Sequence, residues 1–155
     1  MPVEIERKFL VTGDAWREGS RPVKIIQGYL SRDPDRTVRV RQKGDAAFLT
    51  IKGRATGITR TEIEFPIPLT DARDLFLLCL TPLIDKTRYL LTHAGHTWEV
   101  DEFHGENEGL ILAEIELPSE DSPFEPPPWL GPEVSSDHRY SNSRLSAHPF
   151  KTWPS

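Results

Sequence analysis

The feature that most constrains the fold is a strict alternation of charged and apolar side chains, which first occurs in the sequence EIERK at residues 4–8. Because successive side chains of a β-strand point to opposite faces, Glu4, Glu6 and Lys8 would share one face of a strand. On a single strand this pattern is typical of an ordinary solvated sheet. Its return on nearly every later predicted strand indicates a sheet with one face reserved for charge.

Length and composition limit the class of protein. The 155 residues have the size of one domain, and we expect a single domain over residues 1–155. The net charge of −5 argues against a general nucleic-acid-binding protein, and no apolar run is long enough to span a membrane. The single cysteine, Cys79, allows no disulfide within the chain, and the early charge at Glu4 is unlike a secretory signal. We therefore expect a cytoplasmic protein that binds neither nucleic acid nor membrane.

Strand signals dominate the sequence, with one clear helix predicted over residues 71–80. The predicted strands cover residues 2–11, 23–30, 37–42, 48–52, 58–67, 86–91, 97–103 and 110–117. Short connections favour antiparallel pairing, because parallel strands need long crossovers. Residues 122–132 contain three consecutive prolines and are predicted as an extended connector, whereas residues 135–147 are weakly helical.

Acids and bases on the charged face are separated by strand. The acidic set is Glu4, Glu6, Glu62, Glu64, Glu99, Asp101, Glu114 and Glu116, and the basic set is Lys8, Arg39, Arg41, Lys52, Lys86 and Arg88. Wet sheet faces usually mix polar residues with pairs of opposite charge, whereas here like charges come in doublets. If the sheet closes with this face inward, divalent cations and an anionic ligand are needed to neutralise the two sets. A solvated sheet face remains the alternative interpretation.

An inward-facing charged surface places the apolar residues on the outside of the sheet. The helix at 71–80, the carboxy-terminal segment or a second subunit must then cover them. One helix is too little for this purpose, and we therefore expect a homodimer.

The charged constellation suits hydrolysis of a phosphoanhydride. Arginine forks hold phosphate oxygens in pairs, lysine adds a compact charge, and carboxylates bind Mg²⁺ or Mn²⁺, which lower the pKa of a bound water. Six converging cations exceed what a monophosphate needs, and they favour a triphosphate or a longer polyphosphate. The sequence has no Walker A loop, no glycine-rich dinucleotide motif and no His-Glu-x-x-His zinc spacing.

These residues resemble the CYTH superfamily, the triphosphate tunnel metalloenzymes. The segment EIERK looks like the Glu-x-Glu-x-Lys signature, and similar positions follow in order over essentially the whole chain, at 27–30, 37–41, 50–52, 62–64, 86–89, 114–116 and 137–142. The resemblance is strongest to short bacterial members that resemble inorganic triphosphatases. It implies a mainly β (α+β) fold, a closed eight-stranded antiparallel β-barrel that forms a tunnel, with a few peripheral helices. It also implies that residues 133–147 act as a plug helix at one tunnel mouth.

The resemblance assigns roles to individual residues. Those implied to grip phosphates are Lys8, Arg39, Arg41, Lys52, Lys86 and Arg88. Those implied to hold metals, directly or through water, are Glu4, Glu6, Glu62, Glu64, Asp101, Glu114 and Glu116. Tyr29 is expected to hydrogen-bond Lys8 and with it to help activate the attacking water, although a packed aromatic role explains Tyr29 equally well. His138 stands where near relatives are expected to carry a basic residue, and Glu99 matches no motif position.

The first hypothesis is therefore metal-dependent hydrolysis of inorganic triphosphate (tripolyphosphate) to pyrophosphate and phosphate. A metal-activated water inside a charged tunnel would attack, with Mg²⁺ or Mn²⁺ as cofactor. Related enzymes include class IV adenylyl cyclases and thiamine triphosphatases, and Trp98 and Trp129 would then be candidate stacking surfaces for an organic group. A non-catalytic polyphosphate- or nucleotide-binding module is the third hypothesis, and the large carboxylate set argues against it.

Overall fold

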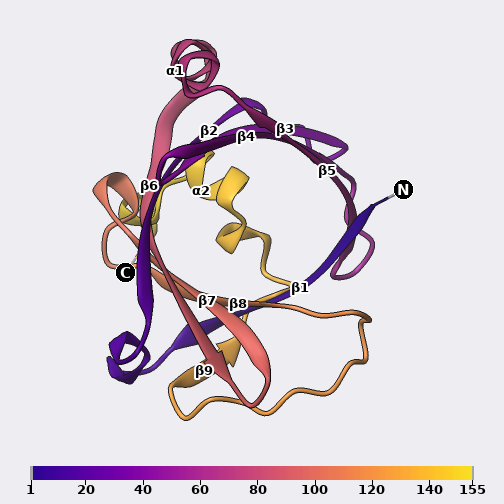
Figure 1. Ribbon diagram of the computed structural model, residues 1–155, viewed down its shortest axis with the longest axis vertical. Helices are drawn as coiled ribbons and strands as arrows, with labels where there is room; N and C mark the ends of the chain where they lie inside the picture. Colours follow the sequence, from indigo (N-terminus) through magenta and orange to yellow (C-terminus); the bar gives the residue numbers. More distant parts are fainter. Residues whose placement is uncertain (1, 155) are drawn as a thin grey trace.

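Eight antiparallel strands close into a barrel in the computed structural model, which describes residues 2–154 (Figure 1). The barrel strands are β1 (Val3–Val11), β2 (Arg21–Ser31), β3 (Arg36–Lys43), β4 (Ala46–Gly53), β5 (Thr59–Ile67), β6 (Leu80–His93), β7 (His96–Phe103) and β8 (Ile111–Glu116). Their order around the ring is β5-β4-β3-β2-β6-β7-β8-β1, and pairing of β1 with β5 closes it. The predicted fold class is confirmed.

Strand β1 closes the barrel by pairing on both of its edges. One edge pairs with β8, where Glu6 lies opposite Glu116. The other edge pairs first with β5 and then, around Phe9, with a short additional strand, β9 (Leu130–Glu133). The sequence analysis predicted an extended connector here and missed β9, because its Gly-Pro dipeptide is typical of a loop and tolerated only at a sheet edge.

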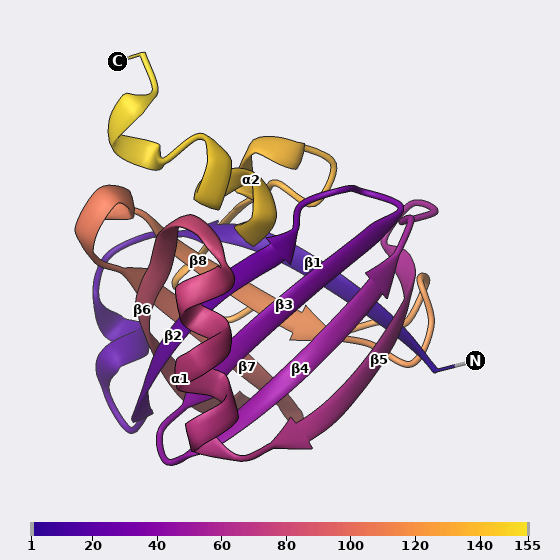
Figure 2. The same ribbon diagram turned by 90° about the horizontal axis from the view of Figure 1, so that it is seen from above.

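The helix α1 (Leu69–Leu78) lies on the outside of β2, β3 and β4 (Figure 2). It ends two residues before the predicted boundary, and β6 begins directly afterwards at Leu80, six residues earlier than the strand predicted at 86–91. Pro82 led to the wrong boundary, because a proline after a helix reads as a stop signal rather than as part of the next strand. The apolar cluster under α1 joins Ala72 and Cys79 to Val40 of β3.

The carboxy-terminal segment is less helical than predicted for residues 133–147. It forms a 3₁₀ turn at His138–Tyr140, the six-residue helix α2 (Asn142–Ala147) and a second 3₁₀ turn at Phe150–Thr152. Ser141 caps α2, since its Oγ accepts a hydrogen bond from the backbone amide of Arg144 at 3.3 Å. The segment lies over one end of the barrel, where Leu145 packs against inward-facing apolar residues of the strands (Figure 2).

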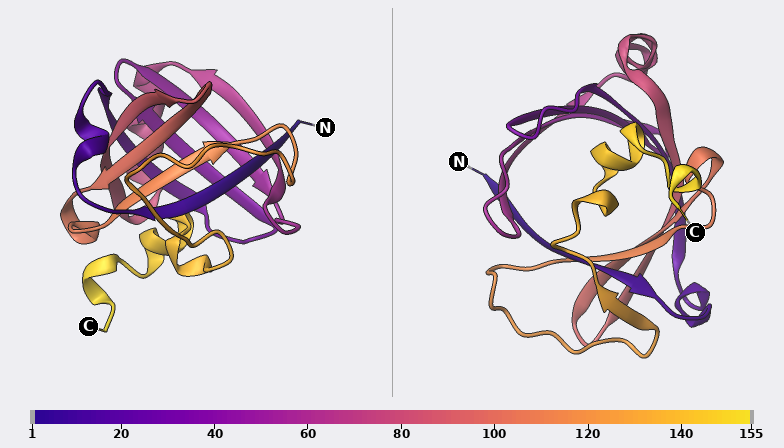
Figure 3. Two further views of the ribbon diagram at one scale, coloured as in Figure 1. Left: turned by 90° about the horizontal axis from the view of Figure 1, so that it is seen from below. Right: turned by 180° about the vertical axis from the view of Figure 1, so that it is seen from behind.

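The cavity of the barrel is charged and the outer face carries apolar clusters, as the alternation predicts, whereas the interior is apolar at the end that the carboxy-terminal segment covers. On the outer face of β1, β7 and β8, the cluster around Phe9, Trp98 and Ile115 is covered by Trp129 and by the long loop between β8 and β9 (Figure 3). This loop supplies cover that the sequence analysis did not foresee.

Part of the outer face is not covered. Three apolar side chains remain exposed on the outside of β1, β4 and β5, namely Val3, Ile51 and Phe65. The expected homodimer, the cytoplasmic location and the single-domain organisation stay predictions. None of the helices within residues 2–154 is long and apolar enough to cross a membrane.

Replacing Gly28 by alanine is expected to destabilise the protein by about 1–3 kcal/mol, because the added methyl group overpacks the contact between β2 and the start of β6. A Cβ at this position would lie 2.6 Å from Leu83 Cδ2 and 2.9 Å from Cys79 Sγ. Urea denaturation measures the free energy of unfolding. The matched control is Gly53→Ala, whose Cβ would lie 3.5 Å from Thr61 Cβ, an ordinary contact. An equal loss in both variants would contradict the prediction.

Candidate functional site

The barrel interior holds a cavity of about 330 Å³ whose wall is almost entirely charged or polar. The predicted site residues that line it are Glu4, Glu6, Lys8, Tyr29, Arg39, Arg41, Lys52, Glu62, Glu64, Arg88, Glu114 and Glu116. The strands bring them together through register, since Lys8 of β1 lies opposite Glu114 of β8, and Lys52 of β4 lies opposite Glu62 of β5. Residues far apart in the sequence therefore share one small space.

Cations and carboxylates of the cavity pair with one another. Lys52 Nζ lies 2.6 Å from Glu4 Oε1 and 3.2 Å from Glu62 Oε2. Arg39 Nη2 lies 3.7 Å from Glu64 Oε2, and Thr50 Oγ1 links the two by hydrogen bonds. The residues predicted to grip phosphate thus neutralise residues predicted to hold metal.

Other carboxylates of the cavity repel one another. Burial and the charges of Glu114 and Glu4 raise the pKa of Glu6 well above its ordinary value. Burial also raises the pKa of Glu116, with Glu4 and Glu62 adding to the effect. Burial opposes ionisation of Glu114 too, but Lys8 and Arg88 outweigh it and bring the pKa of Glu114 to about 2. A divalent cation would relieve this crowding, and the donor set therefore fits a hard metal ion.

Protein side chains alone do not complete a metal centre here. Residues 2–154 contain no group of three or more histidine, cysteine, aspartate or glutamate side chains placed to hold a metal ion. Mg²⁺ commonly binds through one or two carboxylates, with waters and substrate phosphates as its other ligands. The cavity suits a cation that arrives with an anionic ligand.

Some cations of the cavity have no carboxylate partner in the part of the chain that the structure describes. Arg41 Nε donates to Gln27 Oε1 at 2.8 Å, and burial, together with the charges of Arg39 and Arg88, lowers the pKa of Arg41 to about 9. Arg60, which also lines the cavity, donates from Nε to the carbonyl oxygen of Gly53 at 3.0 Å. These two guanidinium groups therefore have no carboxylate counter-ion among the described residues and are available to an anionic ligand.

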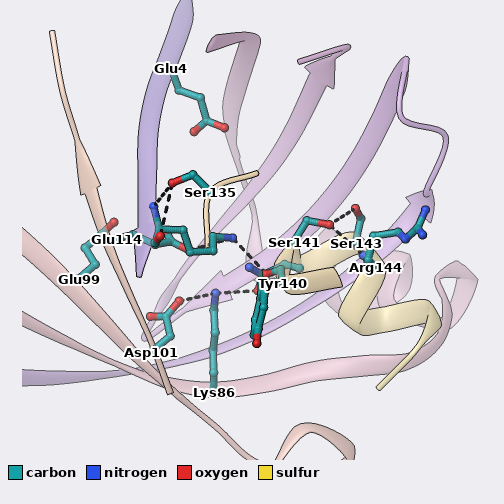
Figure 4. A network of polar contacts seen from close by, with 12 residues as sticks. Glu4, Lys86, Glu99, Asp101, Glu114, Ser135, Tyr140, Ser141, Ser143 and Arg144 are labelled. Atoms are coloured by element: carbon teal, nitrogen blue, oxygen red, sulfur yellow. Dashed lines mark hydrogen bonds and ion pairs between the residues drawn. The ribbon is translucent and has the colours of Figure 1, made fainter. Parts of the chain in front are cut away.

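Two predicted site residues, Lys86 and Asp101, do not line the cavity. Both are fully buried, and Lys86 Nζ lies 2.7 Å from Asp101 Oδ2 (Figure 4). Asp101 also accepts hydrogen bonds from Arg88 Nε at 2.8 Å and Nη2 at 3.0 Å. Burial opposes the charge of Asp101, but Arg88 and Lys86 hold its pKa far below the ordinary range. Asp101 therefore anchors Arg88 from beneath the cavity wall.

The carboxy-terminal segment adds residues to the cavity wall that the sequence analysis did not assign to the site, although it noted His138 and the family match at 137–142. Those lining the cavity are Ser135, His138, Ser141, Asn142 and Ser143. Lys8 Nζ donates to the carbonyl oxygen of Tyr140 at 3.2 Å, and Asn142 Oδ1 accepts from Lys86 Nζ at 2.9 Å. The side chain of Arg139 instead pairs with Asp137 at the surface. Serine and asparagine carry too weak a signal in a sequence for this role to be predicted.

Tyr29 lines the cavity, but its hydroxyl accepts a hydrogen bond from Gln27 Nε2 at 3.2 Å. Within residues 2–154 no hydrogen bond joins Tyr29 to Lys8, in contrast to the expectation from sequence. Glu99 also lines the cavity, and its Oε2 accepts from Arg88 Nη1 at 3.0 Å. Because Glu99 and Asp101 are two residues apart on β7, the alternation already placed Glu99 on the inward face of the strand.

Comparison with known proteins agrees with this geometry. The CYTH domain matches residues 2–146. An inorganic triphosphatase of Acetivibrio thermocellus is 49% identical over 154 residues, which cover 99% of each chain. An inorganic triphosphatase of Nitrosomonas europaea is 39% identical over 148 residues, covering 92% of this chain and 96% of the relative. The crystal structure of the inorganic triphosphatase NE1496 superposes with a TM-score of 0.69 and 36% identity, covering 100% of this chain and 99% of the other. The protein therefore belongs to the CYTH family.

Proposed function

We propose that the protein hydrolyses inorganic triphosphate to pyrophosphate and phosphate, with a divalent cation, Mg²⁺ or Mn²⁺, as cofactor. The observation that carries the proposal is the cavity itself, in which lysines and arginines face a crowded set of glutamates. The two relatives named inorganic triphosphatase, 49% and 39% identical over nearly their full lengths, support the choice of substrate.

The cations of the cavity bind the substrate. Arg39, Arg41, Arg88 and Lys52 surround it with donors, and an arginine fork can hold two phosphate oxygens at once. Lys8, which lies between β8 and the carboxy-terminal segment, stabilises the charge that develops on the phosphate under attack. Lys86 acts indirectly, since it is buried beneath the cavity and holds Asp101.

The carboxylates of the cavity hold the divalent cation. This set is Glu4, Glu6, Glu62, Glu64, Glu114 and Glu116, acting directly or through water. When bound, the cation withdraws charge from the phosphate oxygens and makes a coordinated water more acidic. Asp101, with both oxygens engaged by Arg88 and Lys86, contributes by orienting Arg88. Tyr29 lines the cavity and remains a candidate for orienting the attacking water.

The alternatives with an organic head group have less support. Trp98 and Trp129, the candidate stacking surfaces, are buried in the cluster outside the barrel and do not line the cavity. Tyr29 is the single phenylalanine, tyrosine or tryptophan of the cavity wall within residues 2–154, and its ring packs in the apolar cluster with Leu145. Among the described residues, no tryptophan or phenylalanine is therefore placed to stack on a base or a thiazole ring in the cavity.

Phosphate release from tripolyphosphate, ATP and thiamine triphosphate, each with Mg²⁺, Mn²⁺ or EDTA, tests the proposal. We expect rapid release from tripolyphosphate with a divalent cation, slow release from the organic triphosphates, and only background release in EDTA. Comparable rates on ATP would show that the cavity binds the triphosphate tail and tolerates the head. Binding of tripolyphosphate without release would leave a binding module and would contradict the proposal.

A further inference from the structure

Arg88 has a carboxylate at each end of its guanidinium group. Asp101 engages Nε at 2.8 Å and Nη2 at 3.0 Å, whereas Glu99 engages Nη1 at 3.0 Å. Glu114 Oε2 lies 3.7 Å from Nη2. Asp101 therefore occupies the edge of the guanidinium group formed by Nε and Nη2, and Glu99 occupies the Nη1 end.

The two carboxylates bonded to Arg88 differ in their freedom to move. Asp101 is fully buried and is also hydrogen-bonded to Lys86. If its side chain moved away, Arg88 and Lys86 would both lose a buried counter-ion. The side chain of Glu99 is 30% exposed and lines the cavity. Within the described residues, Arg88 is its one ion-pair partner. The pair with Asp101 is therefore permanent, and the pair with Glu99 is exchangeable.

A phosphate entering the cavity competes with Glu99 for the same end of Arg88. Phosphate oxygens and carboxylate oxygens both accept from the guanidinium group, and both carry negative charge. Once displaced, the carboxylate of Glu99 lies in the neighbourhood of Glu114, its cross-strand partner, and of Glu116. Lys8 Nζ lies 3.5 Å from Glu114 Oε1 and offsets one of these charges, but the remaining like charges are unfavourable in a partly enclosed space without a further cation. A divalent cation that enters with the phosphate removes this penalty.

We infer that Glu99 is a positioning residue that makes the binding of triphosphate depend on a divalent cation. In the free protein it neutralises Arg88, and on binding the phosphate takes its place while the cation compensates the released carboxylate. This inference rests on the proposed function. Because coupling between two ligands is reciprocal, Glu99 also makes cation binding depend on triphosphate.

Isothermal titration calorimetry of Glu99→Gln tests this coupling. The probe is imidotriphosphate, a triphosphate whose bridging oxygens are replaced by NH groups, titrated in EDTA and in Mg²⁺. Glutamine keeps the shape and one acceptor of Glu99 but removes the charge that competes with phosphate. We expect the affinity in EDTA to rise about threefold to tenfold, and the enhancement by Mg²⁺ to fall by a similar factor. A residue with a merely structural role would weaken binding under both conditions.

Two variants serve as controls. Glu102→Gln changes a carboxylate of the same strand that points outward and pairs with Arg17, and both affinities should stay at the wild-type values. Glu99→Asp keeps the charge and should retain the Mg²⁺ enhancement. If the wild-type protein hydrolyses tripolyphosphate but Glu99→Gln binds imidotriphosphate in EDTA no more tightly than the wild type does, the inference is wrong and the proposed function stands. Absence of both binding and turnover in the wild-type protein would overturn the proposed function and the inference with it.

Discussion

Lys8→Ala is expected to lower kcat/KM for tripolyphosphate by a factor of about 100 or more, since loss of one oriented charge in an enclosed site typically has this effect. The ammonium group of Lys8 is held 3.5 Å from Glu114 Oε1 and 3.2 Å from the carbonyl oxygen of Tyr140, and its side chain is only 14% exposed. Steady-state phosphate release with a divalent cation measures the loss.

Arg7→Ala is the matched control for Lys8→Ala. Arg7 precedes Lys8 on β1, but its side chain points outward and pairs with Glu133 of β9. Its loss should leave turnover near the wild-type value. If Lys8→Ala folds, as shown by circular dichroism, and keeps more than about a tenth of wild-type kcat/KM, Lys8 does not belong to the site.

Asp101→Ala is expected to destabilise the protein by about 3–5 kcal/mol, the usual effect of removing one partner from a buried ion pair. Asp101 accepts three hydrogen bonds from Arg88 and Lys86 and has no solvent exposure. Without it, two cations lose their main counter-ion in a buried region. Urea denaturation of the metal-free protein measures this loss separately from any change in metal binding.

Glu102→Ala separates the buried ion pair from a surface one. Glu102 follows Asp101 on β7 and pairs with Arg17 on the outer side, where solvent screens the charges. We expect a loss of less than about 1 kcal/mol. If Asp101→Ala loses no more stability than Glu102→Ala, the assignment of Asp101 as the anchor of Arg88 is wrong.

Sequence alone predicts which side of each strand faces the interior. The period of two is a property of the extended backbone, and it correctly placed charged residues such as Glu6, Arg39 and Lys52 in the cavity. The apolar exterior followed from the same alternation. Most of the candidate site could therefore be predicted without knowing which strands are neighbours.

Depth within the barrel could not be predicted in this way. Strands of a barrel are tilted and staggered, so that position along a strand does not give height in the tunnel. Asp101 lies opposite Leu112, at a level where inward-facing side chains are apolar and the carboxy-terminal segment covers them. Only the closed register shows that Asp101 lies under the cavity and Glu99 in its wall. The strand β9 and the early start of β6 likewise depend on tertiary pairing.

The position of β1 in the ring has a consequence for the order of events during synthesis. This first strand pairs with β8 and β9, near the other end of the chain, where Glu6 meets Glu116 and Phe9 meets Glu133. Such distant contacts form late, because the intervening chain must lose its freedom first. A nascent chain on the ribosome therefore cannot close the ring until β8 has emerged. Glu4, Glu6 and Lys8 of β1 join the other charged residues only in that closing event, and until then the binding surface for metal and phosphate is incomplete.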